Sequence, residues 1–431
     1  MSNLNNQKNR KVAVTFIDRL DRKFQLRVDS GKPTLPLLSS LHIPLDAVII
    51  EKNGQIVDET SILNFGDSVI IRMVRAYHLF DFLLRELDLR VGEKSKTTSS
   101  SLYTKRLLWF NDDGQTELIE KRVSRDKFAS FLENTFIESI LEKKLIEEGD
   151  TIGLALSGGR DSLALLYLLA ATRKRLPSFR LKGATICEVS NIRDIEIAKE
   201  ASCQLEIDQK LIEIGEVKKI FGLKITMEDT LGFILKRYGL AKAINCAHAY
   251  VKTCLEIHFA KEGVNKIAFG LHNEDLLASL LRSVVNGIPF GKSIYQKSWG
   301  PFTFIYPLWG ITKKELTIYL DVVAPKKHCS QKNPATFDRG GHSRDLQYFL
   351  ADSIQTLWPG FSYHAFEGYK KLFSSVQLES KFNKCRNCQG IFIPNEANQS
   401  ENICYLCQLL MELKLLNKGR ARLLSTSSFD N

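Results

Sequence analysis

The chain has 431 residues, 44% of them hydrophobic and 10% aromatic, which is enough for roughly two to four packed domains. Its formal net charge of +11 favours a polyanionic partner, because cations that contact phosphates release condensed counterions; a mildly basic surface is the alternative. The sequence has no apolar run of about 18 residues and no signal-peptide core, so it predicts no membrane span and a cytoplasmic location.

Residues 11–75 alternate short apolar runs with turn signals, which predicts a small α/β unit. Alternating apolar residues around Val14 and Leu26 flank the polar stretch 18–22 and predict a β-hairpin. The remaining expected elements are a helix over 34–41, a hairpin turn at Asn53–Gly54 and a closing strand over 69–74.

This order of elements resembles the ubiquitin-like β-grasp fold of the ThiS/MoaD sulfur carriers. The likeness is carried by IPLDAVIIEKNGQIVDETSILNFGDSVIIRMV, residues 43–74. Those carriers end in Gly-Gly, whose terminal carboxylate becomes a thiocarboxylate. Here the chain continues through Arg75–His78 without a glycine pair, so the resemblance implies a docking or RNA-contacting module rather than a carrier. We assign this β-grasp domain to residues 1–77.

The middle of the chain predicts a connection followed by a larger domain. Residues 78–124 are expected to be a linker with a hairpin, because 92–104 is rich in Ser, Thr and Lys and 111–114 is a turn signal. A helix near 125–144 opens a domain over 125–378, in which helical and apolar-strand segments alternate and predict a parallel sheet.

A strand, a tight loop and a helix are predicted over residues 151–169, and the loop is Ser157-Gly158-Gly159-Arg160-Asp161-Ser162. Glycines let the backbone approach a ligand without a Cβ clash, and N–H groups at a helix start bind anions. Ser157 and Ser162 could donate hydrogen bonds, Arg160 could neutralise phosphate, and Asp161 could hold Mg²⁺ or orient the loop. A plain glycine turn is the alternative.

The six-residue string is not a Walker A loop but resembles the S-G-G-x-D-S signature of the PP-loop (N-type) ATP pyrophosphatases. The resemblance implies a Rossmann-like (HUP) domain that cleaves ATP between its α and β phosphates and adenylates a substrate. Arg160 stands where the sulfurtransferase branch commonly has Lys, and its guanidinium is planar and bulkier than an ammonium.

Further segments resemble the tRNA thiolation enzymes of the cytosolic thiouridylase and thiocytidine types, over roughly residues 125–420. The resemblance implies that Gly270, Glu274 and Asp275 contact the nucleotide or its metal, although Leu271 stands where the family has histidine. Helix N-terminal acids that stabilise the dipole are the alternative for the two carboxylates. The segments are 267–275, 306–315, Cys329 with Arg339–Arg344, and the tail 403–419 (ICYLCQLLMELKLLNKG).

That family carries a C-x-x-C pair and a third cysteine at the ATP site, which bind an iron–sulfur cluster or carry sulfur. Cys246 and Cys329 match the first and third positions by spacing, whereas Ala249 occupies the second and Cys254 lies too far along the helix. The resemblance therefore implies two catalytic cysteines in a persulfide and disulfide cycle and disfavours a cluster. A buried helix residue is the alternative for Cys246.

The last segment, 379–431, contains Cys385-x-x-Cys388 and Cys404-x-x-Cys407 separated by fifteen residues. This spacing is typical of a zinc ribbon in which four thiolates hold one Zn²⁺, and a pair of redox motifs is the alternative. The basic residues that follow either contact tRNA phosphates or form a solvated helix face. They are Lys414, Lys418, Arg420 and Arg422.

The sequence thus predicts an ATP-dependent tRNA sulfurtransferase that adenylates a nucleobase carbonyl and replaces its oxygen with sulfur. The expected catalytic residues are Cys246, Cys329 and Asp161, the expected cofactors ATP, Mg²⁺ and Zn²⁺, and the expected partners tRNA and a sulfur donor or carrier protein. A homodimer is left open. One rival is a lysidine-synthetase-like ligase, which the zinc tail disfavours. Another is a non-catalytic tRNA-binding partner subunit, which the missing second cysteine favours and the intact loop opposes.

Overall fold

The computed structural model divides the chain into two compact units. Unit 1 combines 1–138 with 271–290 and 308–372, and unit 2 combines 139–270 with 291–307 and 373–431. Within the ranges described, no helix is long and apolar enough to cross a bilayer. Those ranges are 11–17, 23–41, 43–74, 101–110, 116–188, 192–287, 291, 293–329, 342–373, 382–394 and 402–417.

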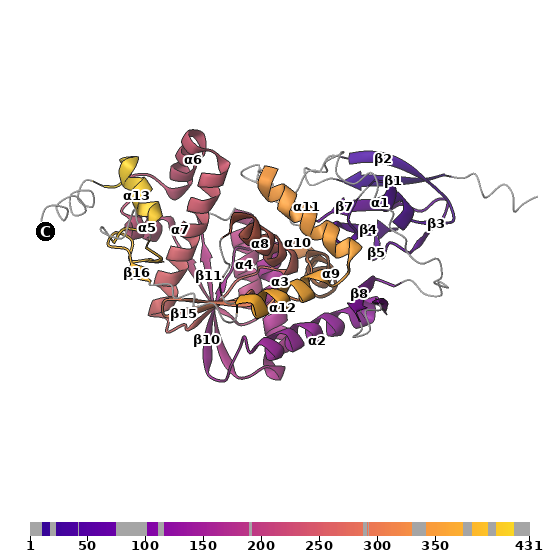
Figure 1. Cartoon of the computed structure of the whole chain (residues 1–431), viewed down its shortest axis with the longest axis horizontal. Coiled ribbons are helices and arrows are strands. Elements are labelled where there is room, and N and C mark those ends of the chain that lie inside the picture. Colours follow the sequence, from indigo (N-terminus) through magenta and orange to yellow (C-terminus); the bar gives the residue numbers. More distant parts are fainter. Residues whose placement is uncertain are drawn as a thin grey trace, which may run out of the picture. The chain divides into compact units, whose positions relative to one another are not determined.

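The N-terminal part of unit 1 is a five-stranded sheet in the order β2-β1-β7-β4-β5 (Figure 1). Strand β1 pairs antiparallel with β2 and parallel with β7, so both predicted hairpins and the closing strand are present. Asn53 and Gly54 have φ values of 53° and 78°, which the β4–β5 hairpin requires. The turn 18–22 lies outside the described residues. The strands are β1 (Lys11–Ile17), β2 (Lys23–Asp29), β4 (Val48–Lys52), β5 (Gln55–Val57) and β7 (Val69–Met73).

One apolar core joins this sheet to a helix from much later in the chain. Alternate residues such as Val14 and Ile71 are buried, as period-two alternation dictates, and Leu38 of α1 (Leu35–Ser40) covers them. Phe349 of α11 (His342–Leu357) belongs to the same core. This shared core explains why the compact units depart from the predicted domain boundaries at 77, 124 and 378.

A second hairpin follows, formed by β8 (Tyr103–Phe110) and β9 (Thr116–Val123). The linker expected over 92–104 is wrong at its C-terminal end, since Tyr103 is buried and begins β8. The hydroxyls of Ser101 and Thr104 both donate to buried Asp58, so these two side chains serve internal hydrogen bonds. Residues 92–100 lie outside the described part. The predicted helix is α2 (Arg125–Lys143).

A buried ionic network lies beneath this hairpin, within unit 1. Glu59 contacts Arg106, and its other oxygen lies 3.3 Å from Nζ of Lys314. Burial alone would raise the pKa of Glu59, but Lys314 and Arg106 outweigh it and lower the pKa to about 2. Lys105 lies 2.8 Å from Glu315. The remaining described elements of unit 1 are β3 (Lys32–Pro33), β6 (Ile62–Leu63), α8 (Asn273–Asn286), α9 (Lys313–Val323), α10 (Lys326–Cys329) and α12 (Phe361–Phe373).

Unit 2 contains a six-stranded sheet in the order β12-β11-β10-β13-β15-β14, parallel except at its β14 edge. The predicted α/β fold with a parallel sheet is therefore confirmed (Figure 1). Its strands are β10 (Asp150–Ala155), β11 (Phe179–Ile186), β12 (Asp208–Ile212), β13 (Lys266–Ala268), β14 (Gln296–Trp299) and β15 (Phe302–Ile305). Its helices are α3 (Arg160–Thr172), α4 (Ile192–Gln204), α5 (Ile214–Phe221), α6 (Met227–Tyr238) and α7 (Leu240–Lys261).

The strand order reverses at β10. The chain runs from β10 outward through β11 to β12 on one side, then returns to β13 on the other. Such a reversal separates the loops at the carboxyl ends of the two neighbouring strands, and ligands of open α/β sheets bind in that crevice. The topology therefore points to the loop after β10.

Candidate functional site

The loop that follows β10 is held by its own hydroxyl groups. The Oγ atoms of Ser157 and Ser162 lie 3.1 Å apart, and the Gly159 N–H donates to Ser157 Oγ at 3.2 Å. Ser162 Oγ in turn donates to the Gly159 carbonyl at 2.9 Å. Helix α3 starts at Arg160 with glycine as its N-cap, and no described side chain caps it. Its first turn thus presents backbone N–H groups and the positive end of the helix dipole.

Two glycines are required by close packing around this loop. Gly158 has φ of +76°, and a Cβ there would lie 2.0 Å from the backbone oxygen of Asp194. At Gly270, just after β13, a Cβ would lie 3.0 Å from the Ser162 nitrogen and 3.1 Å from the Asp161 carbonyl carbon. The structure therefore brings Gly270 against the first turn of α3, as the ATP-site prediction requires. Whether these residues bind ATP stays a prediction.

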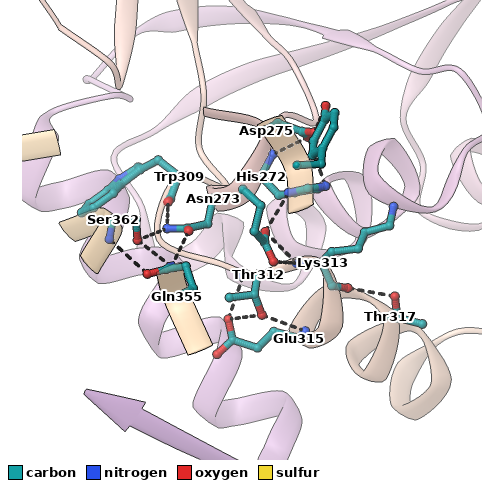
Figure 2. Close-up of polar contacts among 12 residues, drawn as sticks. His272, Asn273, Asp275, Trp309, Thr312, Lys313, Glu315, Thr317, Gln355 and Ser362 are labelled. Carbon is teal, nitrogen blue, oxygen red and sulfur yellow. Dashed lines mark hydrogen bonds and ion pairs between the residues drawn. The ribbon is translucent and has the colours of Figure 1, made fainter. Parts of the chain in front are cut away.

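Glu274 and Asp275, the predicted acids, belong to unit 1 and contact groups there. Figure 2 labels Asp275 together with His272 and Lys313. Asp275 accepts hydrogen bonds from the His272 N–H at 3.2 Å and from Tyr348 OH at 2.7 Å. Glu274 is fully buried, and both its oxygens accept the Lys313 N–H, at 3.2 and 3.1 Å. These contacts are those of the alternative interpretation, acids at helix N-termini. A role in ATP binding stays a prediction.

The same cluster secures the start of α9 and the end of α11. Thr312 and Glu315 form a reciprocal capping box, in which the Glu315 N–H donates to Thr312 Oγ1 at 3.2 Å. Asn273 Nδ2 donates to Ser362 Oγ at 2.8 Å, and Gln355 Nε2 donates to Asn273 Oδ1 at 2.8 Å (Figure 2). The whole cluster is hydrogen-bonded internally, which rigidifies unit 1.

The two predicted catalytic cysteines differ in how far the structure describes them. Cys246 is fully buried on α7, and burial raises the pKa of its thiol to about 11, with Lys242 lowering it and Cys404 raising it. It is therefore a thiol at neutral pH. Cys329 ends α10 in unit 1, but its side chain lies outside the described residues, as does most of Arg339–Arg344. Their predicted partnership stays untested.

The four cysteines of the tail come together. The Sγ atoms of Cys385, Cys388, Cys404 and Cys407 all lie within 4.8 Å of one another, and those of Cys388 and Cys404 are 3.8 Å apart. Four thiolates about 2.3 Å from one tetrahedral ion would be separated by about 3.8 Å, so the group fits a single metal ion. Contacts among the four sulfurs lower the pKa of Cys385 and raise the pKa of Cys388 and Cys407.

The sulfur group is carried by β16 (Asn383–Lys384), β17 (Ile391–Phe392) and α13 (Tyr405–Glu412). This segment is fixed to α7 and α5, because the Ile391 N–H donates to Glu256 Oε2 at 3.0 Å and Asn387 Nδ2 donates to the Phe221 carbonyl at 3.0 Å. Asn387 also donates to Cys407 Sγ at 3.2 Å, which orients that ligand. Lys418, Arg420 and Arg422 lie outside the described residues; Lys414 is exposed.

Sequence reasoning missed Asp194 and Glu188. Asp194 lies in the first turn of α4, and its backbone carbonyl packs directly against Gly158. Glu188 follows β11, and its carboxylate accepts the N–H groups of Met227 and Glu228 at the start of α6. The sequence signal that could have identified them is an acidic residue shortly after a predicted parallel strand. The carboxyl ends of parallel strands meet at one edge of the sheet, where ligands bind.

No family model matches the chain. The chain is 25% identical over 285 residues to a probable sulfurtransferase of Methanocaldococcus jannaschii, covering 64% of this chain and 79% of that protein. It is 26% identical over 216 residues to a tRNA-cytidine(32) 2-sulfurtransferase of Dechloromonas aromatica, covering 50% of this chain. The chain spans 65% of that relative's length, which is less than two thirds.

Among solved structures, the chain is similar to a U34-tRNA thiolase, NcsA, from Methanococcus maripaludis, solved with its 4Fe-4S cluster. The two are 17% identical, and the match covers 69% of this chain and 92% of that one with a TM-score of 0.49. An NMN synthetase from Francisella tularensis matches 57% of this chain with a TM-score of 0.33.

Proposed function

We propose that this chain, a member of the PP-loop tRNA thiolation family, is an ATP-dependent sulfurtransferase that replaces a nucleobase carbonyl oxygen of tRNA with sulfur. The observation that carries the proposal is the loop Ser157–Ser162 at the switch point of the sheet, where α3 begins with a glycine N-cap directly after β10. Sulfurtransferase relatives support the reaction class. The substrate base and the tRNA are left unspecified.

The residues of the loop have distinct tasks in this proposal. The N–H groups at the start of α3 and the Ser157 and Ser162 hydroxyls would bind phosphate oxygens of ATP, and Arg160 would neutralise their charge. Asp161 would hold the Mg²⁺ that accompanies ATP. Gly158 and Gly270 would keep side chains out of the phosphate cradle, which a Cβ at either position would narrow.

The activation chemistry is needed because a carbonyl oxygen is a poor leaving group. Attack of that oxygen on the α-phosphorus forms an adenylate and releases pyrophosphate. The outer sulfur of a cysteine persulfide then bonds to the activated carbon, and AMP leaves with the oxygen. A second thiol attacks the inner sulfur, so that the S–S bond breaks, the outer sulfur stays on the base as the thiocarbonyl, and the two thiols form a disulfide that an external thiol reduces. Of the two predicted cysteines, Cys329 is the better candidate for this transfer, because burial keeps Cys246 protonated. A sulfur donor or carrier protein would regenerate the persulfide.

The tail would hold Zn²⁺ through Cys385, Cys388, Cys404 and Cys407. The bound ion would give this segment, a zinc ribbon, a fixed shape against α7. An iron–sulfur cluster spreads its cysteine ligands over several irons, so the 4.8 Å limit on these sulfurs favours one ion. The sheet β2-β1-β7-β4-β5 with α1 supports the β-grasp interpretation of the N-terminal region. That region would act as a docking module. The cytoplasmic location stays a prediction.

The test measures conversion of α-labelled ATP to AMP with unmodified tRNA, followed by mass spectrometry of the nucleosides. We expect tRNA-dependent transfer of the α label to tRNA as an adenylate, and release of AMP with a new thionucleoside when a sulfur donor is added. The Cys329→Ala variant should form the adenylate and pyrophosphate but no thionucleoside, whereas Cys203→Ala, at an exposed position on α4, should match the wild type. Failure of the purified metal-loaded chain to bind ATP or pyrophosphate would overturn the proposal.

A further inference from the structure

Two exposed tyrosines and two cations gather on one surface of unit 2. Tyr238 ends α6 and is 41% exposed, and Tyr405 begins α13 and is 40% exposed. Nζ of Lys242, in the first turn of α7, lies 4.4 Å from the Tyr405 ring centroid and 5.8 Å from that of Tyr238. The Arg237 guanidinium lies 5.6 Å from the Tyr238 ring. We call these four residues the Tyr–Lys surface.

The segments that carry the Tyr–Lys surface are fixed to one another. Helix α13 packs against α7, and α7 packs against α6. The Lys224 N–H donates to the Leu415 carbonyl at 3.0 Å, and the Asn417 N–H donates to the Gly222 carbonyl at 2.8 Å. These backbone bonds hold the ribbon on the segment between α5 and α6. The two tyrosines, far apart in sequence, are thus held on either side of one ammonium group.

Within the part of the chain that the structure describes, the cations of the Tyr–Lys surface have no carboxylate partner. Among the residues described, no carboxylate pairs with Lys236, Arg237 or Lys242, in contrast to Lys105 and Lys314 of unit 1. Exposed Lys224 and Lys414 lie at the same junction, since Nζ of Lys224 donates to the Lys414 carbonyl at 2.8 Å. Unpaired positive charge with half-exposed rings is complementary to a polyanion that has planar bases.

We propose that the Tyr–Lys surface binds the tRNA substrate, by stacking unpaired nucleobases on Tyr238 and Tyr405 while Lys242 and Arg237 contact phosphodiesters. The proposal rests on the proposed function, which supplies tRNA as the substrate. Single-stranded RNA is recognised by stacking on aromatic rings, and the cations align its backbone. An acidic protein partner would satisfy the cations, whereas single-stranded RNA brings planar bases together with the phosphates and so uses both the rings and the cations.

The test is filter binding of unmodified tRNA to the full metal-loaded chain over a range of salt concentrations. The double variant Tyr238→Leu with Tyr405→Leu should weaken binding by about fivefold or more, whereas both changes to Phe should retain it. Lys242→Gln should lower the slope of log affinity against log salt by about 1. Lys261→Gln, an exposed lysine at the other end of α7, is the matched control and should leave the affinity within about twofold of wild type.

Measured zinc content identifies any variant whose four-cysteine segment is disturbed, and Lys242→Gln, which lies on α7 outside that segment, keeps the test independent of its fold. Unchanged tRNA affinity and salt slope in Lys242→Gln and in the double Leu variant would overturn the proposal and leave the surface to a protein partner. Weakened tRNA binding in those variants, with a wild type that forms no thionucleoside, would support the surface and overturn the proposed function instead.

Discussion

Helices α3 and α8 begin after neighbouring strands of the same sheet, β10 and β13, but their first turns are built in opposite ways. Helix α3 starts with a glycine cap and a loop whose hydroxyls bond to one another. Helix α8 starts with side chains that fill its cap positions: His272 is the N-cap and Asp275 completes a capping box. A helix start capped by side chains is complete by itself, whereas one made of backbone N–H groups is suited to an anion.

The charged side chains of unit 1 resemble the start of α8, because they too are paired with groups of the protein. Glu59, Arg106, Lys314, Lys105 and Glu315 contact one another in its interior, so their charges are used for folding. Substitutions in unit 1 should therefore change stability and leave nucleotide use intact. Substitutions in the loop Ser157–Ser162 should do the reverse.

Glu59→Gln should produce the largest change in stability, about 3–5 kcal/mol at pH 7, because it removes the carboxylate that pairs with buried Lys314 and leaves Arg106 with Glu120 alone. The pKa of Glu59 is lowered from 4.5 to about 2 in the folded state. Its stabilisation is thus complete above pH 4.5 and is lost as pH falls towards 2. Urea unfolding at pH 7 and at pH 3 measures both effects.

The matched control for this prediction is Glu51→Gln. Glu51 lies 3.5 Å from Arg72 on a partly exposed face of the same sheet, so we expect a loss below about 1 kcal/mol. Equal losses for the two variants, or a Glu59 effect that does not shrink in acid, would show that the buried network is not what stabilises unit 1.

Gly158→Ala should lower kcat/KM for AMP formation by about 100-fold, because the new Cβ would lie 2.0 Å from the Asp194 oxygen and must displace the loop. Gly263→Ala is the matched control: Gly263 has φ of +67°, similar strain, and nothing lies within 4 Å of an added Cβ. Initial rates with labelled ATP decide the point. Similar activities for the two variants would remove the loop from the nucleotide site.

The parallel sheet, the loop and the four-cysteine group were predictable from the sequence because each has a local signature. Buried parallel strands appear as apolar runs such as Ile152–Leu156, and glycines beside Ser157 and Ser162 indicate a tight turn before a helix. The paired C-x-x-C spacing indicates four ligands at one centre. In each case the residues that interact are close in sequence or fixed by a known spacing.

What the sequence did not reveal depends on long-range contacts. Ser101 and Thr104 have linker composition, but their hydroxyls bond Asp58, more than forty positions away. Glu274 aligns with an acid of the family's predicted ATP site, and in the structure its carboxylate accepts the N–H of Lys313, the first residue of α9. Phe349 joins the N-terminal core from α11. Composition and register describe single segments, and these roles are set by partners in other segments.

Glu274→Gln tests whether the start of α8 serves the fold. The buried carboxylate accepts the Lys313 N–H, so loss of its charge should destabilise the protein by about 1–2 kcal/mol, through a weaker cap on α9. The KM for ATP should stay within about twofold of wild type. A KM raised about tenfold or more at unchanged stability would restore Glu274 to the nucleotide site. Thermal unfolding and ATP titrations on one preparation separate these outcomes.

Asp275→Asn and Tyr348→Phe should have the smallest effects, about 0.5–1.5 kcal/mol each, because Tyr348→Phe removes one hydrogen bond and Asp275→Asn weakens the two that Asp275 accepts. The Tyr348 OH lies 2.7 Å from Asp275, so the two losses should not add in the double variant. Urea unfolding of the single and double variants measures this coupling. Additive losses would mean that the two side chains act separately, and Asp275 would then need another partner to account for its place in the first turn of α8.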